Sequence, residues 1–248
     1  MSKHFELLQE LEKEQSRHSD PIPAPAFPPE ELVARSGDQS RWATDEALRL
    51  VQQIFLPQTQ DPPRVVVFAG LAHRSGCSQI SASVAETLAK HSNRPVCLVE
   101  ANFRSPALPE MFSTTNHYGL TDALLRKEPI TSFVKPLPQE NLWLLSSGKL
   151  AEDSPELLSS THFQERITQL RQQFDFIIID APPLTQYSDA VAIGQRTDGL
   201  VLVLEANSTR REAASAITQN LRAADIPILA AVLNKRTFPI PEQIYKRI

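Results

Sequence analysis

The sequence predicts an α/β fold built on a doubly wound, mostly parallel sheet. Strand-like runs alternate with helical patterns over most of the chain, which is typical of parallel sheets with crossover helices. Two of these runs, 176–179 and 200–204, are apolar throughout, as strands covered on both faces are. A turn of small residues lies between the apolar run 65–68 and a helical segment that starts near Ile80. Strand, tight turn and helix in this order favour a phosphate-binding loop.

The composition excludes several classes of protein. The 248 residues suffice for one α/β domain with an appendage, and a net charge of −4 gives no reason to expect nucleic-acid binding. Two cysteines, Cys77 and Cys97, predict no disulfide framework and fit a reducing compartment. No apolar run approaches the roughly 20 residues of a membrane span, and the N-terminus lacks an apolar signal core. We therefore expect a cytoplasmic protein.

The N-terminal part differs in composition from the rest of the chain. Residues 1–15 predict a short amphipathic helix, and residues 16–43 predict a Pro-rich linker. The α/β domain is expected over 44–238, and residues 239–248 form a C-terminal tail. The first helix of the domain is expected over 44–56, because its apolar residues recur at helical spacing and a proline follows.

Strands and helices then alternate in order along the domain. The apolar runs predict strands at 64–69, 95–101, 141–146, 175–180, 199–205 and 227–233. The helical patterns between them lie at 78–91, 119–127, 154–173, 188–196 and 209–224. Because ligands of such sheets bind at the carboxyl ends of the strands, the residues that follow the strands are the candidate site.

Three segments carry the candidate chemistry. The first is the loop with the sequence FAGLAHRSGCSQI, residues 68–80, and the second is VCLVEANFRSP, residues 96–106. The third is FDFIIIDAPP, residues 174–183, in which Asp180 ends an apolar strand. A carboxylate at that place can hold Mg²⁺ directly or through water, together with the Ser78 hydroxyl of the loop. The alternative is that Asp180 is only a helix-capping or turn residue.

Taken together, these segments resemble the bacterial tyrosine kinase (BY-kinase) family of capsular and exopolysaccharide biosynthesis, within the MinD/ParA-like group of P-loop ATPases. The family motifs are roughly A-x-P-G-x-G-K-S/T-T, I-D-x-D-x-R-x-P and Y-D-x-I-I-x-D-x-P-P, and they correspond here to 72–79, 99–106 and 174–183. The resemblance covers about residues 44–236 and implies a P-loop NTPase-like fold of the MinD/ParA/BY-kinase type. It assigns these residues to a nucleotide site: Arg74, Ser75, Gly76, Cys77, Ser78, Gln79, Asp180 and Asn234, with Ser78 and Asp180 as Mg²⁺ ligands.

The chain departs from the family pattern at four positions. Cys77 replaces the lysine that contacts the phosphates, and a neutral thiol is a weak donor. Arg74 replaces the first loop glycine; it is strained if the position has a positive φ, and it either fills the pocket or acts as a substitute cation. Asn102 replaces the catalytic base, and an amide accepts no proton. Glu100 replaces the first aspartate and is expected to keep its charge. Cys77 is expected to be a neutral filler, or alternatively a thiolate stabilised by the helix start and Arg74.

These departures affect phosphate neutralisation, loop geometry and base catalysis, so we expect a degenerate, catalytically impaired family member, in effect a pseudokinase. It would regulate or scaffold exopolysaccharide or capsule assembly. The resemblance implies a chain-length-determinant-type inner-membrane protein, a kinase homologue or a second copy as partner, with recruitment to the inner face of the membrane. The expected cofactor is none, or weakly bound ATP or ADP with Mg²⁺. Two alternatives stay open: an active ATP-dependent tyrosine kinase that uses Arg74, and a ParA/MinD-like nucleotide-dependent switch.

Four further residues are candidates for interaction or modification. Glu46 and Arg49 keep two of the three positions of the family's E-x-x-R-x-x-R ring-forming motif, and the alternative is a solvated pair. Arg104 is expected to hold structure or a partner rather than to catalyse. Tyr245 is the lone tyrosine of the tail, where the family has a tyrosine cluster, and is a candidate phosphosite.

Overall fold

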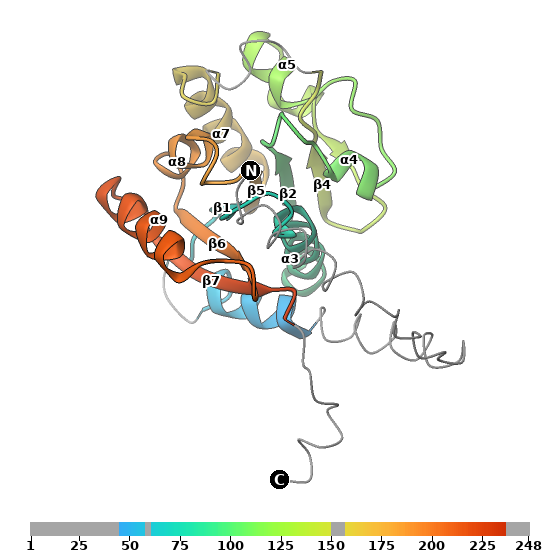
Figure 1. The fold of residues 1–248 in the computed structure, drawn as a ribbon. Coiled ribbons are helices and arrows are strands. Elements are labelled where there is room, and N and C mark those ends of the chain that lie inside the picture. Colours follow the sequence, from blue (N-terminus) through green and yellow to red (C-terminus); the bar gives the residue numbers. More distant parts are fainter. Residues whose placement is uncertain (1–44, 58–60, 150–156, 237–248) are drawn as a thin grey trace, which may run out of the picture. The chain divides into compact units, whose positions relative to one another are not determined.

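A computed structural model of the protein describes residues 45–57, 61–149 and 157–236. Its centre is a seven-stranded sheet with the strand order β3-β4-β2-β5-β1-β6-β7 (Figure 1). Every neighbouring pair is parallel except β3 and β4, which are antiparallel. The predicted doubly wound, mostly parallel sheet is confirmed. The expected N-terminal helix, the Pro-rich linker and the tail with Tyr245 lie outside the described residues.

All six predicted strands are present, with ends shifted by about one residue. The strands are β1 (Val65–Gly70), β2 (Val96–Glu100), β3 (Lys135–Pro136), β4 (Leu142–Leu145), β5 (Phe176–Ala181), β6 (Gly199–Glu205) and β7 (Ile228–Asn234). β3 was not predicted, because a two-residue edge strand that contains a proline carries no alternating pattern.

The helices also follow the predicted order, with one error. They are the unlabelled helix 45–54 (blue in Figure 1), α3 (Cys77–Ser92), α4 (Leu108–Met111), α5 (Leu120–Leu125), the 3₁₀ helix η1 (Ile130–Ser132), α7 (Thr161–Gln173), α8 (Asp189–Gly194) and α9 (Arg211–Ala223). The prediction of one continuous helix over 154–173 is wrong, because residues 158–160 form a turn. The Ser160 hydroxyl accepts from the Phe163 N–H at 3.3 Å and starts α7 there. α4 and η1 are too short for a periodic pattern.

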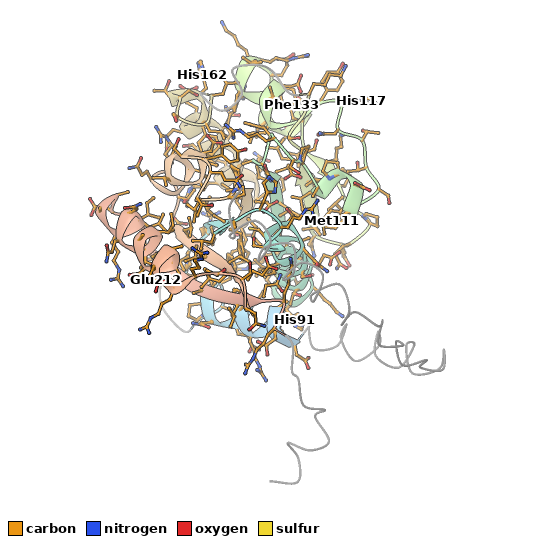
Figure 2. All side chains as sticks on the ribbon, in the orientation of Figure 1. His91, Met111, His117, Phe133, His162 and Glu212 are labelled. Atoms are coloured by element: carbon orange, nitrogen blue, oxygen red, sulfur yellow. The ribbon has the colours of Figure 1, made fainter. Side chains whose placement is uncertain are left out.

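Alternate residues of the strands bury into two separate clusters, one on each face of the sheet. Val65 and Val67 pack with α5, α7, α8 and α9, whereas Val66 and Phe68 pack with the helix 45–54, α3 and α4. Phe133, labelled in Figure 2, is buried in the first cluster. Within the described ranges, no helix is both long and apolar enough to cross a membrane.

Asp198, which directly precedes β6, connects three segments at the amino end of the sheet. Its Oδ2 accepts from the backbone N–H groups of Arg64 at 2.7 Å and Val65 at 2.8 Å, and its Oδ1 pairs with the Arg171 guanidinium at 2.6 Å. Burial opposes ionisation of this carboxyl. The Arg171 side chain and the two N–H donors outweigh that effect and lower the pKa of Asp198 below the ordinary value. Asp198 therefore stabilises the fold in its ionised form.

We expect the stabilisation by Asp198 to be lost in acid. A lowered pKa in the folded state gives stability that is present above the pKa of the unfolded chain and lost as the pH falls below about 4. The variant Asp198→Asn should therefore be less stable than wild type at pH 7, and this difference should shrink by pH 3. Urea denaturation at pH 7, 5 and 3 measures it, with the exposed Asp61→Asn as control. A difference that does not change with pH would contradict the expectation.

Candidate functional site

The three candidate segments meet at the carboxyl edge of the sheet, because β2, β5 and β1 are adjacent strands. Glu100 at the end of β2 lies in register with Asp180 of β5, and Asp180 is in register with Phe68 of β1. Residues 71–76 lead from β1 into α3, which begins at Cys77. The convergence expected from the strand pattern is thus present in the structure.

The loop 71–76 contains two residues in the left-handed region. Gly76 has φ 83°, and a Cβ there would lie 2.2 Å from the Asn234 amide nitrogen, so only glycine fits. Arg74 has φ 60°, as expected if the loop keeps the family geometry without the family glycine. A non-glycine residue in this region is strained by roughly 1–2 kcal/mol. The loop therefore keeps its shape against the preference of residue 74.

The variant Arg74→Gly is expected to stabilise the nucleotide-free protein by about 1 kcal/mol, because glycine removes the left-handed strain. The free energy of unfolding in urea measures this. Asn207→Gly is the matched control, since Asn207 has φ 62° and asparagine tolerates this region, so its gain should be only a few tenths of a kcal/mol. Equal gains in the two variants would contradict the strain at Arg74.

The end of this loop and the first turn of α3 present unpaired backbone donors. Within the described part of the chain, the N–H groups of residues 75–79 donate to no backbone acceptor. They surround the start of α3, where the helix dipole places partial positive charge. Together these features form a cradle that fits a phosphate group.

A buried carboxylate lies beside this cradle. Asp180 is fully buried in β5, and neither of its carboxylate oxygens has a hydrogen-bond partner among the described residues. The hydroxyls of Ser78 and Ser81 face it without reaching hydrogen-bonding geometry. The alternative of a capping or turn residue is therefore wrong for Asp180.

The orphaned oxygens of Asp180, with the Ser78 hydroxyl, fit Mg²⁺. This ion takes oxygen ligands and usually keeps several waters alongside one or two carboxylates and substrate phosphates. A dedicated metal cage of three or more His, Cys, Asp or Glu side chains is absent from the described ranges. Mg²⁺ would here be held together with a nucleotide rather than by the protein alone.

Glu100 lies in surroundings that oppose its charge. Burial, and then repulsion from Asp180, raise the pKa of Glu100 and favour its neutral form. Its Oε2 accepts from the N–H groups of Ala107 at 3.0 Å and Leu108 at 2.7 Å and so positions the start of α4. The direction of this pKa shift opposes the charge that the sequence predicts for Glu100.

The thiol of Cys77 is buried against Asp180. Burial, followed by the Asp180 carboxylate, raises the pKa of Cys77 well above its ordinary value. The alternative of a helix-stabilised thiolate is therefore wrong, because the negative charge of Asp180 and desolvation outweigh the helix start. Cys77 therefore places a neutral side chain at the start of α3.

The remaining candidate residues of the loop and its neighbours differ in exposure. The side chains of Arg74 and Gln79 are exposed, Ser75 is buried, and Asn102 is half-buried in the loop after β2. The Asn234 amide nitrogen donates to the Ser75 carbonyl at 2.8 Å. The Arg74 guanidinium thus lies on the surface of the loop.

Lys235 is a residue that the sequence reasoning missed. Its ammonium lies 2.5 Å from the Arg74 carbonyl oxygen and 3.1 Å from Glu205 Oε1. One signal could have found it, since Lys235 directly follows Asn234 at the carboxyl end of the last strand, where ligands of such sheets bind.

Arg104 is engaged within its own chain. It pairs with the buried Asp189 at the start of α8, and its guanidinium lies over the Tyr187 ring at 3.9 Å from the centroid. This contact ties the loop after β2 to the loop after β5 on the rim of the site.

Glu46 and Arg49 form the expected pair on the helix 45–54. Their side chains lie 3.0 Å apart, and 61 % and 73 % of their surfaces are exposed. An exposed pair of this kind adds little stability, and within the described residues both side chains are accessible to a partner.

Comparison with known proteins identifies a matching family model and several relatives of this chain. A family model described as "ParA: NUBPL iron-transfer P-loop NTPase" matches residues 74–246. The tyrosine-protein kinase YwqD of Bacillus subtilis is 31 % identical over 159 residues, which cover 64 % of this chain and 67 % of YwqD. The tyrosine-protein kinase Etk of Escherichia coli K12 is 23 % identical over 76 % of this chain, but the match spans only 26 % of Etk.

The solved kinase domain of VpsO superposes with a TM-score of 0.72 at 25 % identity, over 80 % of this chain and 98 % of that domain. The predicted P-loop NTPase-like fold is confirmed by these matches. The chain belongs to the bacterial tyrosine-kinase family, within the ParA-like P-loop NTPases.

Proposed function

We propose that this protein is a catalytically impaired bacterial tyrosine-kinase homologue that acts through contacts in capsule or exopolysaccharide assembly. One observation carries the proposal: the buried, neutral Cys77 thiol lies beside Asp180 where the family lysine is expected. A preorganised donor of this kind contributes about 2.7–4 kcal/mol to a transition state, and here it is missing. Asn102 at the position of the catalytic base adds a second loss.

The parts of the site that remain support retention of a nucleotide. The N–H groups of residues 75–79 would hold the phosphates, and Ser78 with Asp180 would hold Mg²⁺. Mg²⁺ supplies charge neutralisation at the phosphates when it is bound. Without the lysine the affinity is weak, and nucleotide would serve to order the loop rather than to phosphorylate.

The proposed place of action is the cytoplasmic face of the membrane. The family resemblance supports a chain-length-determinant-type membrane protein, a kinase homologue or a second copy as partner. The exposed Glu46–Arg49 face of the helix 45–54 is the surface we assign to that contact.

Calorimetry with MgADP and MgATP tests the proposal, followed by phosphotyrosine detection after incubation with MgATP. We expect binding with a Kd of about 100 µM or weaker, abolished by Asp180→Ala, and no phosphotyrosine. Autophosphorylation that disappears in Asp180→Ala would overturn the proposal in favour of an active kinase. Dimerisation that requires ATP would favour a ParA/MinD-like switch instead.

A further inference from the structure

The end of β7 is tied to the loop 71–76 by two successive side chains. Asn234 donates to the Ser75 carbonyl at 2.8 Å, and the Lys235 ammonium donates to the Arg74 carbonyl at 2.5 Å. Glu205, the last residue of β6, holds the same ammonium at 3.1 Å. The loop is therefore linked to the ends of the two strands beyond β1.

These contacts act where the loop is strained. Arg74 has φ 60°, and because it is not a glycine this backbone conformation is strained. The strain favours rotation of the backbone at Arg74 out of the left-handed region. The Lys235 ammonium fixes the carbonyl of that same peptide unit, and a charge-assisted bond is about twice as strong as a neutral one. The Glu205 carboxylate restrains a side chain that would otherwise be free to rotate, because the Lys235 side chain is 44 % exposed.

We infer, on the basis of the proposed nucleotide-binding function, that Lys235 is a positioning residue: held by Glu205, its ammonium keeps the loop 71–76 in the conformation that aims the N–H groups of residues 75–79 at a phosphate. The Lys235 contact thus holds position 74 in the left-handed conformation that a glycine would adopt without strain. It acts through the Arg74 peptide unit and not by contact with the nucleotide.

A ligand-free test uses Arg74 itself, which is a trypsin site inside the loop. Trypsin cleavage of the bond between Arg74 and Ser75 is expected to be about tenfold faster in Lys235→Met than in wild type, because local opening governs cleavage. Lys127→Met removes an exposed lysine elsewhere and should leave the rate unchanged, and Lys235→Arg should restore most of the protection. An unchanged rate in Lys235→Met would overturn the inference.

A double-mutant cycle on MgADP affinity separates positioning from direct contact. Lys235→Met is expected to raise the Kd about tenfold when Arg74 is present, and about threefold or less when it is combined with Arg74→Gly. Equal losses in both backgrounds would overturn positioning and assign a direct contact with the nucleotide.

The two tests also distinguish the inference from the proposed function. If wild type binds no MgADP but cleavage at Arg74 accelerates in Lys235→Met, the Lys235 contact holds the loop while the proposed nucleotide function fails. If wild type binds MgADP and both assays are unaffected by Lys235→Met, nucleotide binding stands and the role of Lys235 is overturned.

Discussion

Replacing Cys77 with lysine is expected to raise the affinity for MgADP by about tenfold to a hundredfold, since a hydrogen bond from a charged group is worth roughly 1.5–3 kcal/mol. Cys77 is the first residue of α3 and lies against Asp180, beside the unpaired N–H groups of the loop. An ammonium at this position would face both the phosphates and the Asp180 carboxylate. It would also favour the ionised form of Asp180, which is the form that holds Mg²⁺.

Calorimetric titration with MgADP measures this gain. Cys77→Met is the matched control, because it adds side-chain volume without charge and should give no gain. A similar increase in both variants would show that volume, and not charge, limits binding. An unchanged affinity in Cys77→Lys would contradict the proposal that the missing cation at position 77 weakens nucleotide binding.

The same lysine variant is expected to remain inactive as a kinase, because Asn102 still cannot accept the proton of a tyrosine hydroxyl. Phosphotyrosine should appear only when Asn102→Asp is combined with Cys77→Lys. Activity in Cys77→Lys alone would contradict the expected role of residue 102.

The strands of this fold could be predicted closely, because a strand that is buried on both faces has a continuous apolar sequence. β5 and β6 are examples, each flanked by neighbours on both sides in the sheet. The place of the site followed from the same strands, since parallel neighbours deliver their ends to one edge. The family motif raised a left-handed conformation at position 74 as a possibility, and the structure has φ 60° there.

The features that could not be predicted depend on partners distant in sequence. The raised pKa of Glu100 results from burial beside Asp180, and no local pattern around residue 100 encodes that neighbour. The Lys235 contact joins β7 to a loop 161 residues earlier in the chain. In each case the outcome is set by geometry that only the folded chain contains.

Arg166→Ala is expected to cost about 2–4 kcal/mol of the free energy of unfolding, because it leaves backbone acceptors without their donor. Arg166 lies on α7 with only 7 % of its surface exposed. Its guanidinium donates to the carbonyls of Ala123 at 2.7 Å and Glu128 at 2.9 Å, and also to that of Arg126. Ala123 lies in the last turn of α5 and Arg126 is its C-cap, where helix carbonyls lack a partner in the helix itself, and Glu128 follows in the next loop.

Urea denaturation measures this loss. The matched control is Arg196→Ala, which also removes two carbonyl contacts, to Ala192 and Ser159, each at 2.8 Å. Arg196 lies nearer the surface, so water can replace it and the cost should stay below about 1 kcal/mol. Equal losses at the two positions would contradict the argument that burial decides the effect. A large loss confined to Arg166 would show that a buried cation can stabilise a fold through carbonyl groups alone, because among the described residues no carboxylate pairs with it.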